Sequence, residues 1–154
     1  MRRTLALALA TLALACSRAP TDPVPALLAD LERAAEARDA AAFAERLSAQ
    51  FRDDHGLDRE QAAQQLKRWF AGYETVALDV YGVEVDRAPG APAARVRCVV
   101  DFRGQGRRLL GLDGLLPPSA AYRFAFDVAD EGGTWRVRGA SYAPVAEEPA
   151  AGAR

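Results

Sequence analysis

The sequence has little of the chemistry that several specific functions require. Its 154 residues include one histidine and two cysteines, too few for the clustered histidine and cysteine ligands of a zinc site. Only one lysine is present. No run of about 20 apolar residues is present to cross a membrane as a helix. The formal net charge is −1 and no basic cluster occurs, unlike in nucleic-acid-binding domains. We therefore expect no bound metal, no cofactor and no nucleic-acid partner.

The amino-terminal segment, in contrast, carries a recognisable pattern. Arg2 and Arg3 give it a basic start, and residues 5–15 are apolar except for Thr11. A basic start followed by a short apolar run and small residues before a cut is typical of a secretory signal peptide. Residues 1–15 are therefore predicted to be a signal peptide that is removed on export.

The residues around the predicted cut resemble the lipobox of bacterial lipoproteins. Ala15 directly precedes Cys16, and Ser17 follows it. The resemblance implies that Cys16 carries a diacylglyceride, with acyl chains such as palmitate, and an acylated amino group; several chains give stable membrane anchoring. Because an Asp after the Cys would resemble an inner-membrane retention signal, Ser17 favours the outer membrane, with the domain facing the periplasm. An ordinary cleaved signal that leaves a free Cys16 thiol is the alternative.

The mature chain is predicted to be one domain with a short segment at each end. Residues 16–154 amount to 139 residues, which is enough to bury a core without disulfides. They contain 18 basic and 21 acidic residues, a net charge of −3. We place the lipidated Cys and a tether at 16–23, the domain at 24–143 and a disordered tail at 144–154.

Three helices are predicted in the first half of the domain. Asp22, Asp39 and Asp58 each precede a stretch with periodic apolar residues and can cap a helix, and Gln61 completes a capping box with Asp58. Apolar residues then recur every three or four positions, as on the buried face of a helix. The expected buried positions are Val24, Leu27, Leu28, Leu31 and Ala35 in the first helix, Phe43 and Leu47 in the second, and Ala62, Leu66, Trp69, Phe70 and Tyr73 in the third.

Alternating apolar residues predict strands in the second half. The first stretch, residues 75–87, changes phase near 80–82, which indicates a bulge or bend. Further alternating stretches are residues 95–103, 122–128 and 134–138, with turns at 88–92 and 130–133. Helices followed by antiparallel strands joined by hairpins are typical of an α+β domain.

The strand at 95–103 separates two kinds of side chain. Cys98 lies on its apolar face and, with Cys16 lipidated, has no partner for an internal disulfide. We expect Cys98 to be buried as a small apolar side chain, with a reactive thiol as the alternative. Arg95, Arg97 and Asp101 lie on the opposite face. They are expected to form solvated cross-strand ion pairs, with an anion-binding pocket as the alternative.

The order of these elements resembles the NTF2-like fold, the cystatin-like cone also found in ketosteroid isomerase and scytalone dehydratase. The resemblance covers residues 24–142 and is carried by segments 38–43, 47–53, 69–70 and 133–137. It implies three amino-terminal helices packed against a strongly bent antiparallel sheet, a pocket at the wide end of the cone, and a short strand at 51–53.

The resemblance does not decide the function. The family includes isomerases, dehydratases, binding modules and interaction proteins, so the fold leaves the activity open. No catalytic position of those enzymes is carried over to this chain. The family often dimerises through its sheet, so the resemblance also allows a homodimer.

One short polar segment offers catalytic candidates. Asp53 and Asp54 precede His55, the sole histidine, and a carboxylate beside an imidazole can act as a general acid–base pair. The same segment also fits a plain polar turn before the capped third helix, with Gly56 ending it. No second histidine or cysteine cluster completes a metal site, so no metal is expected.

The apolar candidates for binding come from two places. Trp69 and Tyr73 belong to a set of aromatic residues that should form the core or border a pocket. The segment 107–118 joins two strands yet contains Leu109, Leu110, Leu112, Leu115 and Leu116. Connections of this length and apolarity are unusual. The segment could be a pocket lid, a docking patch, a membrane-touching finger, or a loop that closes its own core.

Two functions therefore remain for the folded part. The favoured hypothesis is a membrane-anchored, non-enzymatic module that binds a small apolar molecule or docks an envelope protein. The alternative is a small enzyme with acid–base chemistry like that of the isomerases and dehydratases. An enzyme should place a polar group with a shifted pKa in its pocket, whereas a docking module should show an exposed apolar patch and a filled or absent cavity.

Overall fold

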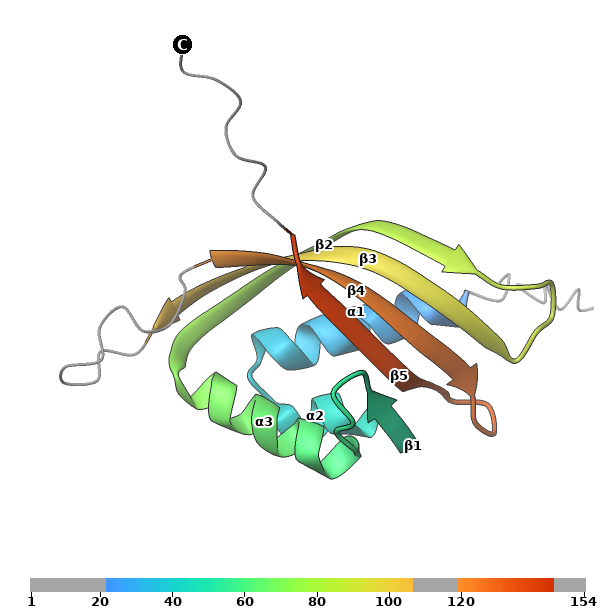
Figure 1. Cartoon of the computed structure of the whole chain (residues 1–154), viewed down its shortest axis with the longest axis horizontal. Coiled ribbons are helices and arrows are strands. Elements are labelled where there is room, and N and C mark those ends of the chain that lie inside the picture. The colour runs from blue at the N-terminus through green and yellow to red at the C-terminus, as the bar shows by residue number, and fades with distance from the viewer. Residues whose placement is uncertain (1–21, 107–118, 146–154) are drawn as a thin grey trace, which may run out of the picture.

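The computed structural model describes residues 22–106 and 119–145, which form an α+β domain (Figure 1). The elements in chain order are α1 (Pro23–Glu36), α2 (Ala40–Glu45), β1 (Leu47–Asp53), α3 (Arg59–Ala71), β2 (Tyr73–Asp86), β3 (Ala93–Gly106), β4 (Ser119–Asp130) and β5 (Trp135–Pro144). The predicted signal peptide, Cys16, the leucine-rich segment 107–118 and most of the predicted tail lie outside the described residues. Within the described ranges no helix is both long enough and apolar enough to span a membrane.

The three helices begin where their caps predict. The Asp22 carboxylate accepts a hydrogen bond from the backbone N–H of Val24 at 3.1 Å. Asp39 accepts bonds from two backbone N–H groups of the first turn of α2. Asp58 accepts from the Gln61 N–H at 2.9 Å while the Gln61 side chain accepts from the Asp58 N–H at 3.0 Å, so the capping box is confirmed.

Two helix ends differ from the sequence prediction. Leu47 is not on the buried side of α2, which ends at Glu45; it opens β1 and lies opposite Val137 in β5. Tyr73 is not on α3 but opens β2 opposite Gly106. Both side chains are buried, as predicted. A spacing of four residues from the last apolar residue of a helix is found both when the helix continues and when a buried strand begins, so the spacing alone does not separate the two cases.

The sheet has five strands in the order β1-β5-β4-β3-β2. All pairs are antiparallel except β1 with β5, which is parallel. The predicted phase change in β2 is confirmed, since its register with β3 shifts between Tyr81 and Glu84. Gly82 lies there with φ of 61°, a conformation that glycine adopts without strain. β5 extends to Pro144, one residue into the predicted tail.

The helices cover one face of the curved sheet (Figure 1). Two apolar clusters form between the helices and the sheet. In the larger cluster Val24, Leu27 and Leu31 of α1 pack with valines from three strands. The smaller cluster joins Tyr73, Val76 and Phe102 with Trp69 packed against them. Full burial of one such side chain stabilises a domain by about 1.5–3 kcal/mol, so the two clusters hold the helices on the sheet.

The outer face of the sheet carries the expected ion pairs of Arg95 and Arg97, whereas Asp101 accepts a hydrogen bond from the Tyr81 hydroxyl at 3.3 Å. Arg95 on β3 donates to both carboxylate oxygens of Asp127 on β4, at 2.9 and 3.2 Å. Arg97 lies 3.3 Å from Glu84 on β2. All four side chains are more than half exposed, so these are solvated cross-strand pairs and not an anion-binding pocket.

Candidate functional site

An open cavity of about 390 Å³ lies between the helices and the concave face of the sheet. Every helix and every strand contributes to its lining, because the bent sheet wraps around the helices without filling the space between them. Members of both apolar clusters form its walls, including Leu31 and Leu47 from the larger one and Phe102 from the smaller. Both clusters therefore border the cavity.

Aromatic rings make up much of the lining. Trp69 of α3 approaches Phe102 with ring centroids 4.6 Å apart. On β4 the rings of Phe124 and Phe126 are stacked at 5.4 Å, and Phe124 lies 5.6 Å from Tyr142 of β5. These are separations at which aromatic pairs attract one another. The rings thus form an apolar wall that an aromatic or aliphatic ligand can contact.

The two aromatic residues predicted as binding candidates have different places. Trp69 lines the cavity and is only partly buried. Tyr73 is fully buried, lies edge-on to Phe102 at 5.0 Å and does not reach the cavity lining. Tyr73 therefore supports the wall from behind. The leucines of segment 107–118 lie outside the described residues.

Few polar groups reach the cavity. The residues of its lining that carry polar groups are Glu32, Asp53, Gln65, Tyr122, Tyr142 and Cys98. The expectation that Cys98 is buried is confirmed, and burial raises the pKa of its thiol to about 11. A thiol with that pKa is protonated at neutral pH and a poor nucleophile. Among the described residues that line the cavity there is no arginine, lysine or histidine.

The predicted polar turn before α3 is present, and it brings three neighbouring residues together. Asp53 accepts hydrogen bonds from the backbone N–H groups of His55 at 3.0 Å and Leu57 at 2.7 Å. Gly56 follows with φ of 81°. Asp54 Oδ1 lies 2.8 Å from Nδ1 of His55. The tight turn thus folds these neighbouring side chains toward one another.

This turn borders the cavity through only some of its side chains. Asp53 lines the cavity, whereas Asp54 and His55 are exposed beside it. The ring of His55 lies 5.4 Å from that of Tyr142, which does line the cavity. Burial raises the pKa of Tyr142, and the charges of Asp53 and Asp54 raise it further. An acid–base group could therefore act at the cavity mouth, at the side where β1 and β5 end.

The same three residues could in principle approach one cation. Their ligand atoms lie within 4.8 Å of one another. The carboxylate of Asp53 already holds two backbone N–H groups, and Asp54 is paired with His55. Their hydrogen bonds explain the arrangement without a metal, and we assign none.

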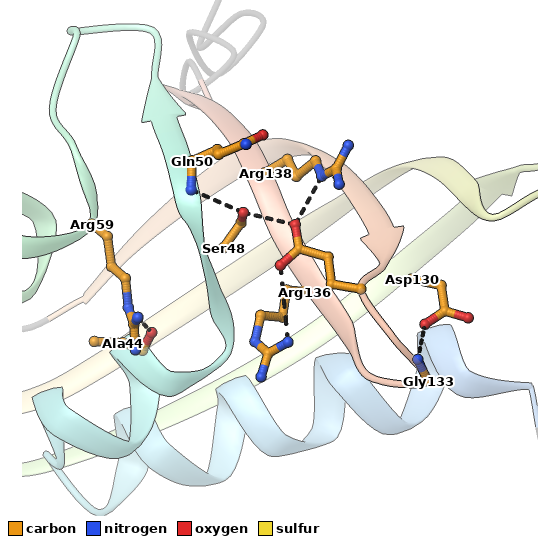
Figure 2. A network of polar contacts seen from close by, with 9 residues as sticks. Ala44, Ser48, Gln50, Arg59, Asp130, Gly133, Arg136 and Arg138 are labelled. Carbon is orange, nitrogen blue, oxygen red and sulfur yellow. Dashed lines mark hydrogen bonds and ion pairs between the residues drawn. The ribbon is translucent and has the colours of Figure 1, made fainter.

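A polar network missed by the sequence reasoning fixes β1 to the β4–β5 hairpin (Figure 2). Ser48 is 1% exposed, and its hydroxyl donates to Glu131 Oε1 at 2.8 Å while accepting from the Gln50 N–H at 3.0 Å. Arg138 donates to the same carboxylate at 2.9 Å. The hydrogen bonds from Ser48 and Arg138 lower the pKa of Glu131. We name Ser48, Glu131 and Arg138 the β1 clamp; it holds one wall of the cone in place.

A second hollow lies outside the cone, and its lining is different. It has a volume of about 610 Å³ and is bordered by Ala37, Arg38, Lys67 and Phe70 among others. It is more open than the cone cavity and is formed largely by a loop and small side chains. The cone cavity, which is the less open of the two and more apolar, is therefore the better candidate for a specific site.

Comparison with known proteins identifies the fold. No protein-family model matches the chain, and no curated protein matches it by sequence. A provisionally named scytalone dehydratase from Novosphingobium aromaticivorans is 12% identical, with 80% of this chain and 82% of that one covered and a TM-score of 0.67. A provisionally named dehydratase of the NTF2-like family from Streptomyces avermitilis is 15% identical, with 81% and 96% covered and a TM-score of 0.67.

A third solved structure, an uncharacterised protein with a cystatin-like fold from Caulobacter vibrioides, is 16% identical, with 80% of this chain and 88% of that one covered and a TM-score of 0.63. Identities this low establish the fold and leave the activity open. The predicted α+β cone is thereby confirmed: the chain has the NTF2-like, cystatin-like fold.

Proposed function

Because the chain has an NTF2-like cone with an open apolar cavity, we propose that it is an exported lipoprotein whose cone binds a small apolar or amphipathic molecule. The cavity of about 390 Å³, lined mainly by aromatic and aliphatic side chains, carries the binding part of this proposal. Ligand pockets commonly have such volumes and such linings, with a few polar groups that orient the ligand. The export part rests on the pattern of residues 1–15 and on Cys16.

The cavity favours ligand binding over docking of an envelope protein. A module that only docks a partner gains nothing from a hollow interior, because unfilled apolar space forfeits packing energy. A ligand that enters the hollow regains those contacts. We therefore place small-molecule binding ahead of docking, and membrane anchoring through Cys16 on the periplasmic side of the outer membrane remains part of the proposal.

Binding is tested by native mass spectrometry of the mature chain without its lipidated cysteine, residues 17–154, exported to a periplasm behind an ordinary cleavable signal peptide. We expect a retained small molecule, or binding of added naphthalene derivatives. Val100→Phe should abolish either, because Val100 lines the cavity and a larger ring would occupy it. Val99→Phe is the matched control, since the neighbouring residue points to the other face of β3. Equal binding by both variants would contradict the cavity as the site.

The anchor is tested separately by labelling cells with radioactive palmitate. We expect the label to enter the wild-type protein and to be absent from Cys16→Ser. A wild-type chain that takes up no label would refute the lipid anchor and leave the binding proposal standing.

A second candidate function is acid–base catalysis at the cavity mouth. It is favoured by the 2.8 Å contact between Asp54 and His55 beside the cavity-lining Tyr142. Its test follows from the first experiment, since the retained compound can be incubated with the protein and its products identified. Turnover lost in His55→Ala with binding retained would support catalysis, whereas unchanged turnover would exclude His55.

A further inference from the structure

We infer that the cone selects hydrophobic molecules that carry an amine and discriminates against those that carry a carboxylate. This inference rests on the proposed binding function and names the chemical class of the ligand. It follows from three features of the cavity: the sign of its charges, the engagement of the nearby cations, and the nature of its walls.

The charged groups of the cavity are all acidic among the residues that the structure describes. Glu32 enters the lining from α1, and Asp53 enters it from the end of β1. Glu32 and Asp53 are each partly buried, so water screens them less than it screens surface groups. A cationic ligand would be attracted by both carboxylates, and an anionic one would be repelled by both.

Two arginines that flank or lie on β1, Arg46 and Arg52, are engaged elsewhere. The Arg52 guanidinium donates to the carbonyl oxygen of Phe51 at 3.0 Å and lies 4.0 Å from Asp58. Arg46 lies 3.2 Å from Asp30 on α1. Neither lines the cavity. A carboxylate in the cavity would thus find tyrosine hydroxyls and the Gln65 amide as donors, but no positive charge from the described lining.

The walls also favour a positive charge. Trp69, Phe124 and Tyr142 contribute aromatic rings to the lining. The face of an aromatic ring attracts a cation, and this attraction increases when the pair is shielded from water. An ammonium group in the cavity is therefore attracted by the aromatic rings as well as by the carboxylates, whereas an anion is disfavoured by both.

The volume limits the size of the ligand. A cavity of about 390 Å³ lies near the lower end of the range common for small-molecule pockets, about 300–1,000 Å³. This suits a body of one or two rings with a short polar group. Naphthylmethylamine, naphthylmethanol and naphthoate are matched probes of this size that differ in charge.

The test measures the Kd of these three probes by isothermal titration calorimetry, using the same lipid-free mature chain, residues 17–154. We expect the amine to bind at least tenfold more tightly than naphthoate, with the alcohol between them. In the double variant Asp53→Asn/Glu32→Gln, the Kd of the amine should rise at least fivefold, while the Kd of the alcohol should change less than twofold. The amide oxygen that Asp53→Asn introduces can still accept from the two N–H groups that the carboxylate holds, so the turn should be preserved.

The double variant Asp79→Asn/Glu84→Gln is the matched control, because it removes two exposed carboxylates away from the cavity. It should leave the preference for the amine unchanged. If naphthoate binds as tightly as the amine, or if the control variant lowers amine binding as much as the cavity variant does, the inference is overturned while the proposed function stands. If none of the probes binds, the proposed function itself fails and the inference fails with it.

Discussion

The two ends of the concave face are built from the same strands, yet one is filled and the other is hollow. On β3, Val96 is completely buried under the larger apolar cluster, whereas Val100 on the same face is only partly buried and lines the cavity. On β4, Val128 is 2% exposed at the filled end, while Phe124 keeps some exposure at the hollow end. Both ends show the same alternation, so alternation does not distinguish a packed core from a binding wall.

The difference lies in what faces the strands. At the filled end α1 supplies Val24 and Leu27, which are 0% and 3% exposed and fit between the strand side chains. At the hollow end the facing residues of α3 include Leu66 and Trp69, which remain partly buried. A filled end contributes stability through close packing, whereas a hollow end leaves contacts for a ligand to make.

The largest expected effect compares one substitution at the two ends. Leu27→Ala should lower the free energy of unfolding by about 2–5 kcal/mol, because a fully buried side chain leaves a cavity. Leu66→Ala should lower the free energy of unfolding by distinctly less, since the Leu66 side chain already borders the open cavity. Urea unfolding followed by circular dichroism measures both. Equal losses would mean that the hollow end is packed as tightly as the filled one.

The parts of this comparison that the sequence predicts are those set by local chemistry. Asp22, Asp39 and Asp58 each cap a helix, because each is followed directly by a stretch of periodic apolar residues. The change of phase in β2 requires a bulge that does not depend on the rest of the chain. The position of Cys98 on the inner face likewise follows from the alternation of its strand.

The parts that could not be predicted depend on pairing over long distances. Leu47 and Tyr73 continue a helical spacing, and only their partners in β5 and β3 place them in strands. Tyr142 borders the cavity because β5 continues past the alternating residues to Pro144, guided by its pairing with β4. The β1 clamp joins Ser48 to Glu131, 83 residues away, and no local pattern marks such a pair.

An effect of intermediate size is expected for the β1 clamp. The clamp holds β1, which borders both the filled end and the hollow end. Glu131→Ala should destabilise the fold by about 1–3 kcal/mol, since it leaves the buried hydroxyl of Ser48 without its acceptor. Ser48→Ala in the same background should add little further loss, because the two residues act as a pair. Urea unfolding of the two single variants and the double variant gives this coupling, and additive losses would show that they act independently.

The clamp also predicts a pH dependence. The pKa of Glu131 is lowered in the fold by its bonds to Ser48 and Arg138, so the folded state binds the proton less readily than the unfolded chain. Its contribution is therefore present above the ordinary pKa of 4.5 and is lost as the pH falls below that value. Glu131→Gln should flatten the loss of stability on acidification relative to the wild type, as measured by thermal unfolding across that range. An unchanged slope would assign the acid sensitivity to other carboxylates.

The smallest expected effect locates the boundary between the two ends. Cys98 lies between Val96 and Val100 on the inner face of β3, is 4% exposed and yet borders the cavity. Burial raises the pKa of its thiol from the ordinary 9.0 to about 11, so the fold holds the proton more tightly than the unfolded chain does. Its contribution to stability is therefore full below about pH 9 and is lost as the pH rises toward 11.

Alkylation of Cys98 by iodoacetamide at neutral pH tests where the filled end gives way to the hollow end. We expect the thiol of Cys98 to react at least tenfold more slowly in the folded protein than in urea, because it is both buried and protonated. Val100→Ala should accelerate the reaction in the folded protein, since it widens the hollow beside the thiol. Val99→Ala, on the opposite face of the same strand, should leave it unchanged. A folded-state rate equal to that in urea would mean that the hollow end reaches past Cys98 toward Val96, and that the filled core is correspondingly shorter.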